Sequence, residues 1–201
     1  MQERVPKRDR IIASALKAFS ERGYHHTRIS EIAENARVAK GTIYLYFRNK
    51  EDLFLGALDS VAQSFLSQLS LELKKPGDAL SKLKRLVHFN LSFLDRNSEF
   101  FRILHRELPA GLSYQLKGEH RRQRLDAYLK TIEEVLIQGQ REGTVDIRGG
   151  PVFAAHALWG MLQAIGHQRL SGMDRRPVVK AAQDITHQFL FGICRKREHG
   201  T

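Results

Sequence analysis

The sequence is poor in cysteine and in long apolar runs, and each shortage excludes a class of protein. Among 201 residues there is one cysteine, Cys194, so no internal disulfide is possible. A small secreted scaffold held together by disulfides is therefore excluded, and a reducing, cytoplasmic setting is expected. The longest apolar stretch, about residues 151–166, is interrupted by His156 and Gln163 and is too short for a transmembrane helix. We expect neither a signal peptide nor attachment to a membrane.

Acidic residues are also in short supply. The chain has 33 Lys and Arg against 22 Asp and Glu, a formal net charge of +11, and a pI of about 10. An excess of this size indicates an acidic partner, which could be nucleic acid or a membrane surface. Residues 1–50 hold eleven basic and five acidic side chains (net +6), whereas the other 151 residues hold 22 and 17 (net +5). The basic excess per residue is thus highest at the N-terminal end, as in a protein that displaces counterions from phosphates.

The residue clusters of an enzyme are missing as well. The nine histidines do not have the spacing of zinc ligands, and neither the cysteine nor paired carboxylates accompany them. Ser14 and Lys17 form a Ser-x-x-Lys pattern that some acylating hydrolases use, but no Ser-Asp-Asn or Lys-Thr-Gly element accompanies it. We predict no catalytic residue, no metal site and no required cofactor.

Apolar residues recur at helical spacing along the whole chain, and no stretch shows the alternation of a strand. We therefore predict an all-α fold of about nine helices. After a mobile arm over residues 1–8, helices are expected at 9–22, at two short segments within 27–47, from 50 to a stop at Pro76-Gly77, and then at 78–96, 100–108, 113–142, 151–170 and 177–196. Residues 1–50 are predicted to form a three-helix DNA-binding domain, and residues 51–201 a helical effector-binding and dimerisation domain.

The most informative stretch is residues 27–50, which has the pattern of a helix-turn-helix. Two short helices that cross steeply need a small residue at their contact, and Ala33 supplies it. The residues with the spacing of a shared core are Ile32, Ala36, Val38, Ile43 and either Tyr46 or Phe47. Residues between them face outward, where Lys40 can donate to a guanine edge and Thr42 or Tyr44 can reach a phosphate. An ordinary helical hairpin within a core is the alternative.

The stretch also resembles a known family. Residues 39–53, Ala-Lys-Gly-Thr-Ile-Tyr-Leu-Tyr-Phe-Arg-Asn-Lys-Glu-Asp-Leu, resemble the recognition helix and the following helix start of TetR-family transcriptional repressors. The resemblance is direct over residues 8–58 and architectural beyond them. It implies a homodimer that binds an inverted-repeat operator on double-stranded DNA, and a C-terminal helical domain that binds a small molecule. Binding of that molecule is expected to favour a dimer geometry that does not fit the operator.

Two positions depart from the family pattern. Arg37 stands in the turn where glycine is usual, and a left-handed backbone there costs a side chain about 1 kcal/mol. Ala39 stands where serine is common, and this removes a helix cap worth about 0.5–2 kcal/mol.

From the outward positions and the resemblance we predict the residues that contact DNA. Thr27 is expected to cap the first of the two short helices or to meet a phosphate, and both uses can coexist. Asn49 is expected to cap the next helix, where the cation of Lys50 suits a nearby phosphate, with a merely solvated lysine as the alternative. The predicted set is Thr27, Arg28, Lys40, Gly41, Thr42, Tyr44, Leu45, Tyr46 and Lys50.

The helices after residue 50 hold more aromatic side chains than a small bundle needs. Each alone is more simply explained as core, but the resemblance implies a hydrophobic effector among them: Phe65, Leu69, Phe89, Phe93, Phe101, Leu104, His105, Tyr128 and Ile132. The motif variant is most similar to that of fatty-acid-degradation repressors, which implies long-chain acyl-CoA as the effector. Its phosphates could be bound by nearby cations, although a solvated face explains these nearly as well: Arg102, His105, Arg106, Arg121, Arg122 and Arg124.

The last two predicted helices carry an apolar set too large for one buried face, which usually indicates a partner. Small residues on the first of them would permit close approach of a symmetry mate in a four-helix seam. The predicted dimer contacts are Phe153, Ala157, Met161, Ala164, Ile185 and Phe189. The remaining alternative for the whole chain is a basic helical dimer that binds nucleic acid or membranes without sequence preference.

Overall fold

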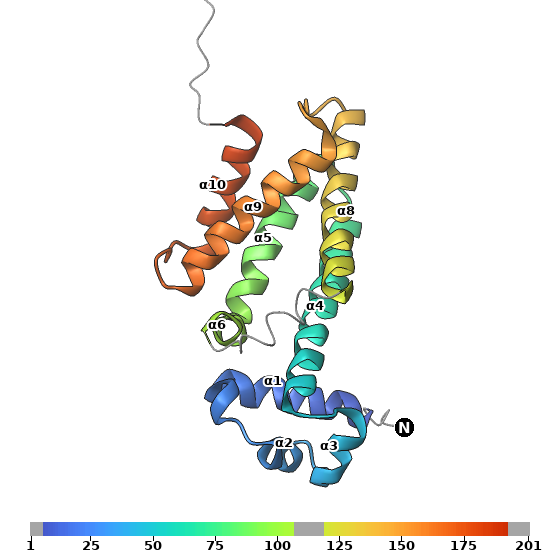
Figure 1. Ribbon diagram of the computed structural model, residues 1–201. Helices are drawn as coiled ribbons and strands as arrows, with labels where there is room; N and C mark the ends of the chain where they lie inside the picture. Colours follow the sequence, from blue (N-terminus) through green and yellow to red (C-terminus); the bar gives the residue numbers. More distant parts are fainter. Residues whose placement is uncertain (1–5, 107–118, 193–201) are drawn as a thin grey trace, which may run out of the picture. The chain divides into compact units, whose positions relative to one another are not determined.

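The computed structural model describes residues 6–106 and 119–192 (Figure 1). Over these residues the chain forms nine helices and no strand, so the predicted all-α fold is confirmed. The helices are α1 (Lys7–His26), α2 (Ile29–Asn35), α3 (Lys40–Tyr46), α4 (Lys50–Lys74), α5 (Ala79–Arg96), α6 (Ser98–Arg106), α8 (Glu119–Arg141), α9 (Gly150–Leu170) and α10 (Val178–Phe191).

The chain divides into two compact units. The first comprises Met1–Ser67 and Asn97–Arg124, and the second comprises Gln68–Arg96 and Leu125–Thr201. Two helices, α4 and α8, contribute residues to both units. The predicted functional division at residue 50 remains a prediction.

The first unit is organised around an aromatic cluster. Phe19 of α1 and Phe54 of α4 meet edge to face with ring centroids 5.1 Å apart, and Phe54 lies 5.7 Å from Phe100 of α6. Edge-to-face pairs of this kind stabilise beyond the area they bury. Helix α1 also packs against α2 and α6, and α2 packs against α3. These contacts hold the two short helices on a fixed base.

Most helix ends of the first unit follow the sequence signals. Gly23 leaves the helical conformation at φ 82°, and one further turn carries α1 on to His26. Helix α1 begins at Lys7, so the arm predicted over residues 1–8 is wrong for its last residues, while residues 1–5 lie outside the described part. Asn49 Oδ1 accepts a hydrogen bond from the Asp52 amide at 2.8 Å, which confirms the predicted cap of α4. The same helix continues into the second unit and ends there at Lys74, before Pro76-Gly77, as predicted.

The second unit is a helical bundle in which α5 packs against α9 and α10. Its core includes Leu83 and Leu86 of α5, each at most 1% exposed, and Ile132 of α8 at 0%. The residue that follows α8, Glu142, is bonded to the start of α5, because its carboxylate accepts a hydrogen bond from the Ala79 amide at 2.8 Å. Helix α10 was predicted to reach residue 196, which is wrong: it ends at Phe191, where Gly192 takes a φ of 68°.

An ion-pair network connects the ends of α5 and α9 with the segment that precedes α10. The Arg169 guanidinium pairs with Asp95 and lies 3.8 Å from Asp174, and Asp174 in turn is 2.9 Å from Arg176. The hydrogen bond from Arg176 is the main reason why the pKa of Asp174 falls from 3.8 to about 2. Because the Asp174 side chain is only 4% exposed, its charge depends on these arginines.

No helix in the described residues is long and apolar enough to span a bilayer.

Candidate functional site

The helix-turn-helix predicted from residues 27–50 is present as α2, a short turn and α3. Ala33 is 3% exposed, and its carbonyl accepts a hydrogen bond from the Val38 amide at 3.0 Å, so the chain reverses tightly after α2. Ile43 of α3 is 1% exposed and joins the same core. Of the two alternatives for the last core position, Phe47 is buried and Tyr46 is 44% exposed.

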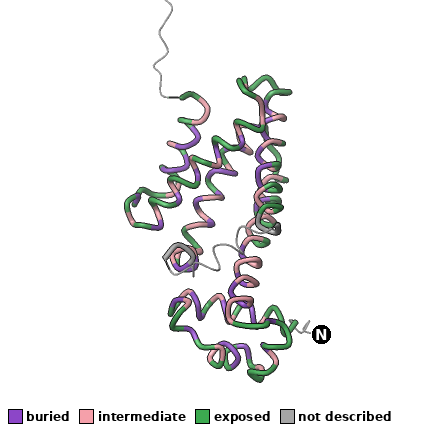
Figure 2. The backbone as a smooth tube through the Cα atoms, in the orientation of Figure 1, coloured by how far each residue is buried: buried purple, intermediate pink, exposed green. Residues whose placement is uncertain are grey.

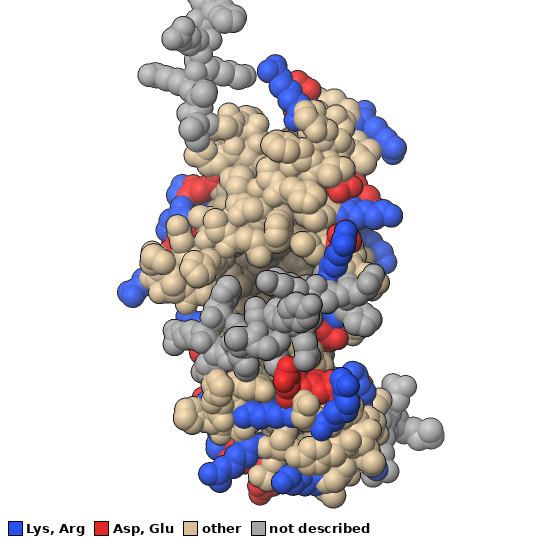
Figure 3. Space-filling view, viewed as in Figure 1, with Lys and Arg blue, Asp and Glu red and all other residues tan. Residues whose placement is uncertain are grey.

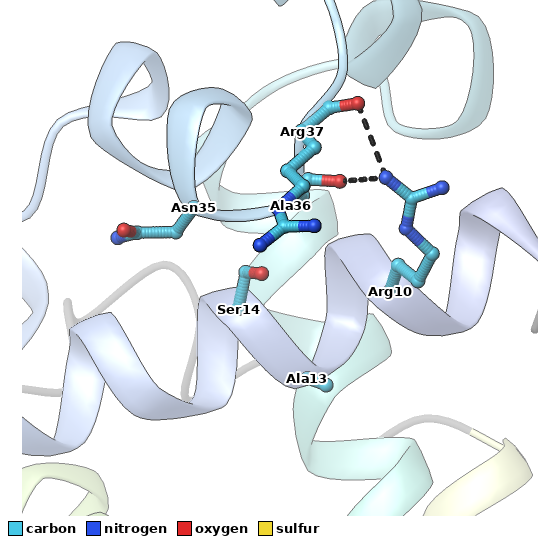
Figure 4. Close-up of a pocket in the computed structure, with 6 residues that line it drawn as sticks. All are labelled: Arg10, Ala13, Ser14, Asn35, Ala36 and Arg37. Carbon is cyan, nitrogen blue, oxygen red and sulfur yellow. Dashed lines mark hydrogen bonds between the residues drawn. The ribbon is translucent and has the colours of Figure 1, made fainter.

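The turn between α2 and α3 has a strained residue and an external support. Arg37 has a φ of 52°, the left-handed conformation in which a side chain is unfavourable, as predicted for a position that favours glycine. Arg10 of α1 reaches across a shallow hollow and donates from Nη2 to the carbonyl oxygens of Ala36 and Arg37, the latter at 3.1 Å (Figure 4). The guanidinium thus connects α1 to the turn that sets the angle between α2 and α3.

Arg10 is the residue of this site that the sequence did not reveal. It stands 26 and 27 residues away from its two acceptors, and no local pattern relates positions so far apart. Its only sequence signal is its membership in the basic N-terminal segment.

The outer face of α3 is open to solvent. Lys40 and Gly41 are exposed, Tyr44 is 48% exposed and Leu45 is 83% exposed, whereas Thr42 is half-buried. Figure 2 draws most of α3 and the preceding turn as exposed. Lys and Arg side chains are spread over the visible surface of the N-terminal helices, with acidic ones among them (Figure 3). The predicted outward set is therefore accessible, and the helical-hairpin-in-a-core alternative does not fit this face.

Ala39 is the N-cap residue of α3, and it makes no side-chain hydrogen bond to the helix. The missing cap predicted from alanine at this position is confirmed. The first turn is closed by the backbone alone, since the Thr42 amide donates to the Ala39 carbonyl at 2.9 Å.

The predicted role of Thr27 is wrong. The cap of α2 is Arg28, and Thr27 is 2% exposed, with the Ala18 and Gly23 carbonyls as acceptors for its hydroxyl at 3.1 and 2.6 Å. Its side chain closes the end of α1 and is not available to a phosphate. Arg28, by contrast, is exposed.

Lys50 begins α4 and also contacts the end of α1. Its ammonium donates to the His25 carbonyl at 3.1 Å and lies 4.7 Å from the centroid of the Tyr24 ring. These contacts fix where the charge lies, so Lys50 is not simply a solvated lysine. A lysine ammonium has three donors, so the same group can still meet a phosphate.

Comparison with known proteins identifies the family. The profile described as "Bacterial regulatory proteins, tetR family" matches residues 11–57. The chain is 32% identical over 152 residues to the "Fatty acid metabolism regulator protein" of Bacillus subtilis (strain 168), a match over 72% of this chain and 74% of the relative. This chain belongs to the TetR family. It is also 33% identical over 140 residues to the "HTH-type transcriptional repressor NicS" of Pseudomonas putida, over 68% of this chain and 64% of NicS.

Solved structures of TetR-family regulators share the fold. The fatty acid degradation regulator FadR from Bacillus halodurans superposes with a TM-score of 0.77 at 26% identity, over 96% of this chain and 98% of that one. FadR from Bacillus subtilis, crystallised in complex with stearoyl-CoA, gives a TM-score of 0.75 at 24% identity, over 92% and 99% of the two chains. The chain is thus a TetR-family transcriptional regulator and not an enzyme.

The residues predicted to contact an effector fall in both units of this TetR-family chain. Phe65 and Phe101 belong to the first unit and are half-buried. The side chains of Leu104 and His105 lie outside the described part of α6. The others belong to the second unit and are buried: Leu69, Phe89, Phe93, Tyr128 and Ile132. Their union in one pocket remains a prediction.

Tyr128 is the one polar group among these buried residues. It is 7% exposed, and its hydroxyl accepts a hydrogen bond from Asn90 Nδ2 at 2.5 Å. Burial raises the pKa of this hydroxyl, because the phenolate would lose its hydration, and the Asn90 hydrogen bond opposes the rise only in part. Tyr128 therefore stays neutral in the folded protein.

The cations proposed for effector phosphates are partly engaged elsewhere. Arg102 pairs with Glu99 within α6, and Arg124 pairs with Asp59 of α4. Arg122 is exposed. The side chains of the remaining three, His105, Arg106 and Arg121, lie outside the described residues.

The predicted dimer contacts divide into exposed and buried groups. Phe153 is 67% exposed, and Ala157 and Ala164 are also exposed along α9. Met161 and Phe189 are half-buried. Ile185 was predicted to face a partner, but it is 3% exposed because its side of α10 packs within the protomer. Ile185 therefore cannot contribute area to an interface.

Proposed function

We propose that this chain is a dimeric, cytoplasmic repressor that binds an inverted-repeat operator and is released from it by a long-chain acyl-CoA. One observation supports this most strongly. In a chain that belongs to the TetR family, α3 buries Ile43 at 1% exposed and presents Tyr44 and Leu45, 48% and 83% exposed, to solvent. A helix anchored on one side and open on the other is the form that enters a major groove.

Within this proposal the outer residues of α3 have separate tasks. Lys40 donates to a guanine edge or a phosphate, and Tyr44 and Tyr46 donate their hydroxyls to phosphate oxygens. Thr42 is half-buried and contributes at the edge of the surface. Arg28 and Lys50 stand at the starts of α2 and α4, where the positive ends of the helix dipoles favour a phosphate.

The proposed dimer seam lies on α9 and the exposed side of α10. Phe153 of α9 and Val179 and Phe191 of α10 are 67%, 56% and 68% exposed, so both helices present large apolar side chains to solvent, as protein interfaces do. Ala157 and Ala164 lie on the same side of α9 as Phe153, four and eleven residues after it, and permit a close crossing. A two-fold dimer would place its two α3 helices about 34 Å apart, one turn of DNA.

The proposed effector rests on the relatives. The similar protein from Bacillus subtilis is named a fatty acid metabolism regulator, and the FadR structure was determined with stearoyl-CoA. Long aromatic and aliphatic side chains such as Phe93 and Leu69 suit an acyl chain, and Tyr128 adds a neutral hydroxyl. Helix α4 is one helix with residues in both units, so we propose it as the element whose position the effector biases.

A direct test selects DNA from a random duplex pool with the purified protein and then measures the affinity for the enriched duplex by fluorescence anisotropy. We expect an inverted repeat, two protomers per duplex, and release by stearoyl-CoA but not by free coenzyme A at the same concentration. A scrambled duplex measures specificity, because a sequence reader keeps a large preference at moderate salt. Equal affinity for both duplexes would instead favour a non-specific basic dimer. If neither stearoyl-CoA nor coenzyme A released the protein from the duplex, acyl-CoA would not be the effector, and the proposal of an operator-binding dimer would still stand.

A further inference from the structure

Leu45 occupies an unusual position for a large apolar side chain. It is 83% exposed, more than Leu71 of α4 at 63% or Phe153 of α9 at 67%. It lies in α3, and its neighbours Tyr44 and Tyr46 are 48% and 44% exposed. The leucine therefore makes almost no contact with its own unit, and its packing does not explain its presence.

The surface beside Leu45 is equally open. Gly41 precedes it by one helical turn on the same face. Apart from the chain neighbours of Gly41 and the backbone of α3 itself, no heavy atom lies within 4 Å of the point where a Cβ would stand on Gly41. The Leu45 side chain therefore does not cover Gly41, and the outer surface of α3 consists of backbone there. A binding partner can therefore approach the backbone of α3 closely along the face that holds Gly41 and Leu45.

The surroundings indicate an anionic partner. Lys40 and Arg48 are exposed near the two ends of α3, although Arg48 also pairs with Asp52 at 3.4 Å. The first 50 residues carry a net charge of +6. Basic residues on this surface would contribute little to the binding of an apolar protein surface, whereas they attract the phosphates of a DNA duplex. In the major groove, only one base presents an apolar group, the 5-methyl of thymine.

We propose that Leu45 is a specificity-determining residue that reads a thymine in each half of the operator through the 5-methyl group of the base. This inference rests on the proposed function, since it requires α3 to lie in a major groove. The tyrosines beside Leu45 donate to phosphates and fix the depth of α3, and the leucine covers the methyl and excludes water from it. No hydrogen bond to the base edge is involved.

The experiment is a cycle of one protein change and one DNA change. Each thymine of the selected operator is replaced in turn, in both half-sites, by deoxyuridine, which removes the methyl and leaves base pairing unchanged. Affinities of the parent and of Leu45→Ala are then measured on both duplexes. Leu71→Ala, which truncates an exposed leucine of α4, is the matched control. Because Leu45 makes so little contact, Leu45→Ala should unfold at the parent's temperature.

For the parent, we expect one thymine position at which deoxyuridine weakens binding by about fourfold for each methyl removed, the factor that follows from burying one such group. For Leu45→Ala, the same replacement should have no effect, and Leu71→Ala should behave as the parent does. A deoxyuridine penalty that persists in Leu45→Ala would assign the methyl effect to DNA shape and overturn the inference. If no deoxyuridine replacement weakened binding by the parent, the inference about Leu45 would also be overturned, and the proposed function would be unaffected. Failure to enrich any duplex would overturn both.

Discussion

Arg10 donates a hydrogen bond from Nη2 to the carbonyl oxygen of Arg37 at 3.1 Å, and Arg37 is the residue of the helix-turn-helix turn with a φ of 52°. The same nitrogen also donates to the Ala36 carbonyl. The turn between α2 and α3 thus contains a strained residue and is also bonded to α1. The strain at Arg37 and the contact from Arg10 can be tested by separate substitutions.

Replacing Arg37 with glycine should stabilise the protein. Glycine adopts a positive φ without steric cost, so the free energy of unfolding is expected to rise by about 1 kcal/mol. Urea denaturation followed by circular dichroism measures this change. Arg37→Ala is the control, because it removes the same side chain and keeps the strained backbone. If alanine stabilised as much as glycine, the side chain and not the backbone would be the cause.

Replacing Arg10 with methionine should weaken the turn. Methionine keeps the aliphatic bulk but leaves two carbonyls without their charged donor, at a cost of about 1–2 kcal/mol in unfolding free energy. Arg22→Met is the matched control, since Arg22 pairs with Glu31 at the surface and such pairs contribute less than about 1 kcal/mol. An Arg10→Met protein as stable as Arg22→Met would show that the contact does not support the turn.

Replacing Tyr44 with alanine should weaken operator binding about tenfold or more, through lost contacts in both half-sites, while leaving the dimer and its stability intact. The operator affinity of Tyr44→Phe, which loses only the hydroxyl, should lie between the affinities of the parent and of Tyr44→Ala. Lys50→Ala should also weaken binding, but its contacts with His25 and Tyr24 would be lost as well. Anisotropy on the selected duplex, with gel filtration of each variant, checks these effects. Parent-like affinity in an intact Tyr44→Ala dimer would remove Tyr44 from the site.

Replacing Phe153 with glutamate should dissociate the dimer without unfolding the protomer. The side chain is 67% exposed in the protomer, so the carboxylate costs little there but is buried without a partner in the proposed seam. Analytical ultracentrifugation measures the shift from dimer to monomer, and operator affinity should fall with it. Leu71→Glu is the control, as Leu71 is exposed on α4 and lies outside α9 and α10. Equal dimer fractions for the two variants would place the seam elsewhere.

Asp174 should contribute stability that acid removes. Its pKa is lowered from 3.8 to about 2 in the folded protein, chiefly by the hydrogen bond from Arg176. Since the folded pKa is below the unfolded one, the contribution is complete above about pH 5 and is lost as the pH falls toward 2. Asp174→Asn should therefore be less stable than the parent at pH 6, by about 1–3 kcal/mol, with a smaller difference at pH 2.5. Urea midpoints across this range measure it, and Asp126→Asn, at an exposed position of α8, is the control.

Much of the fold could be predicted because its signals are local. Helical spacing, the Asn49 cap and the stop at Pro76-Gly77 all act within a few residues. The two family departures were predictable for the same reason, since the φ of Arg37 and the missing cap at Ala39 depend on the backbone of one turn.

Besides two helix ends, the errors concerned the burial of single side chains. Thr27 and Ile185 stand in positions where a pattern permits an outward side chain, but Thr27 bonds to the end of α1 and Ile185 packs inside the protomer. Exposure depends on which neighbour covers a residue, and a periodic pattern does not name that neighbour. Likewise, Arg169, Asp95 and Asp174 meet only after α5 and α9 have packed.

The sequence by itself determined the helical class, the position of the helix-turn-helix and the family, because each depends on residue types at short, fixed spacings. Tertiary structure alone decided that Arg10 supports the turn across 27 residues, that Phe47 and not Tyr46 enters the core, and that Thr27 is buried against the end of α1. The physical reason is that accessibility and long-range hydrogen bonds are properties of packed surfaces. They come into existence only when segments distant in the chain meet.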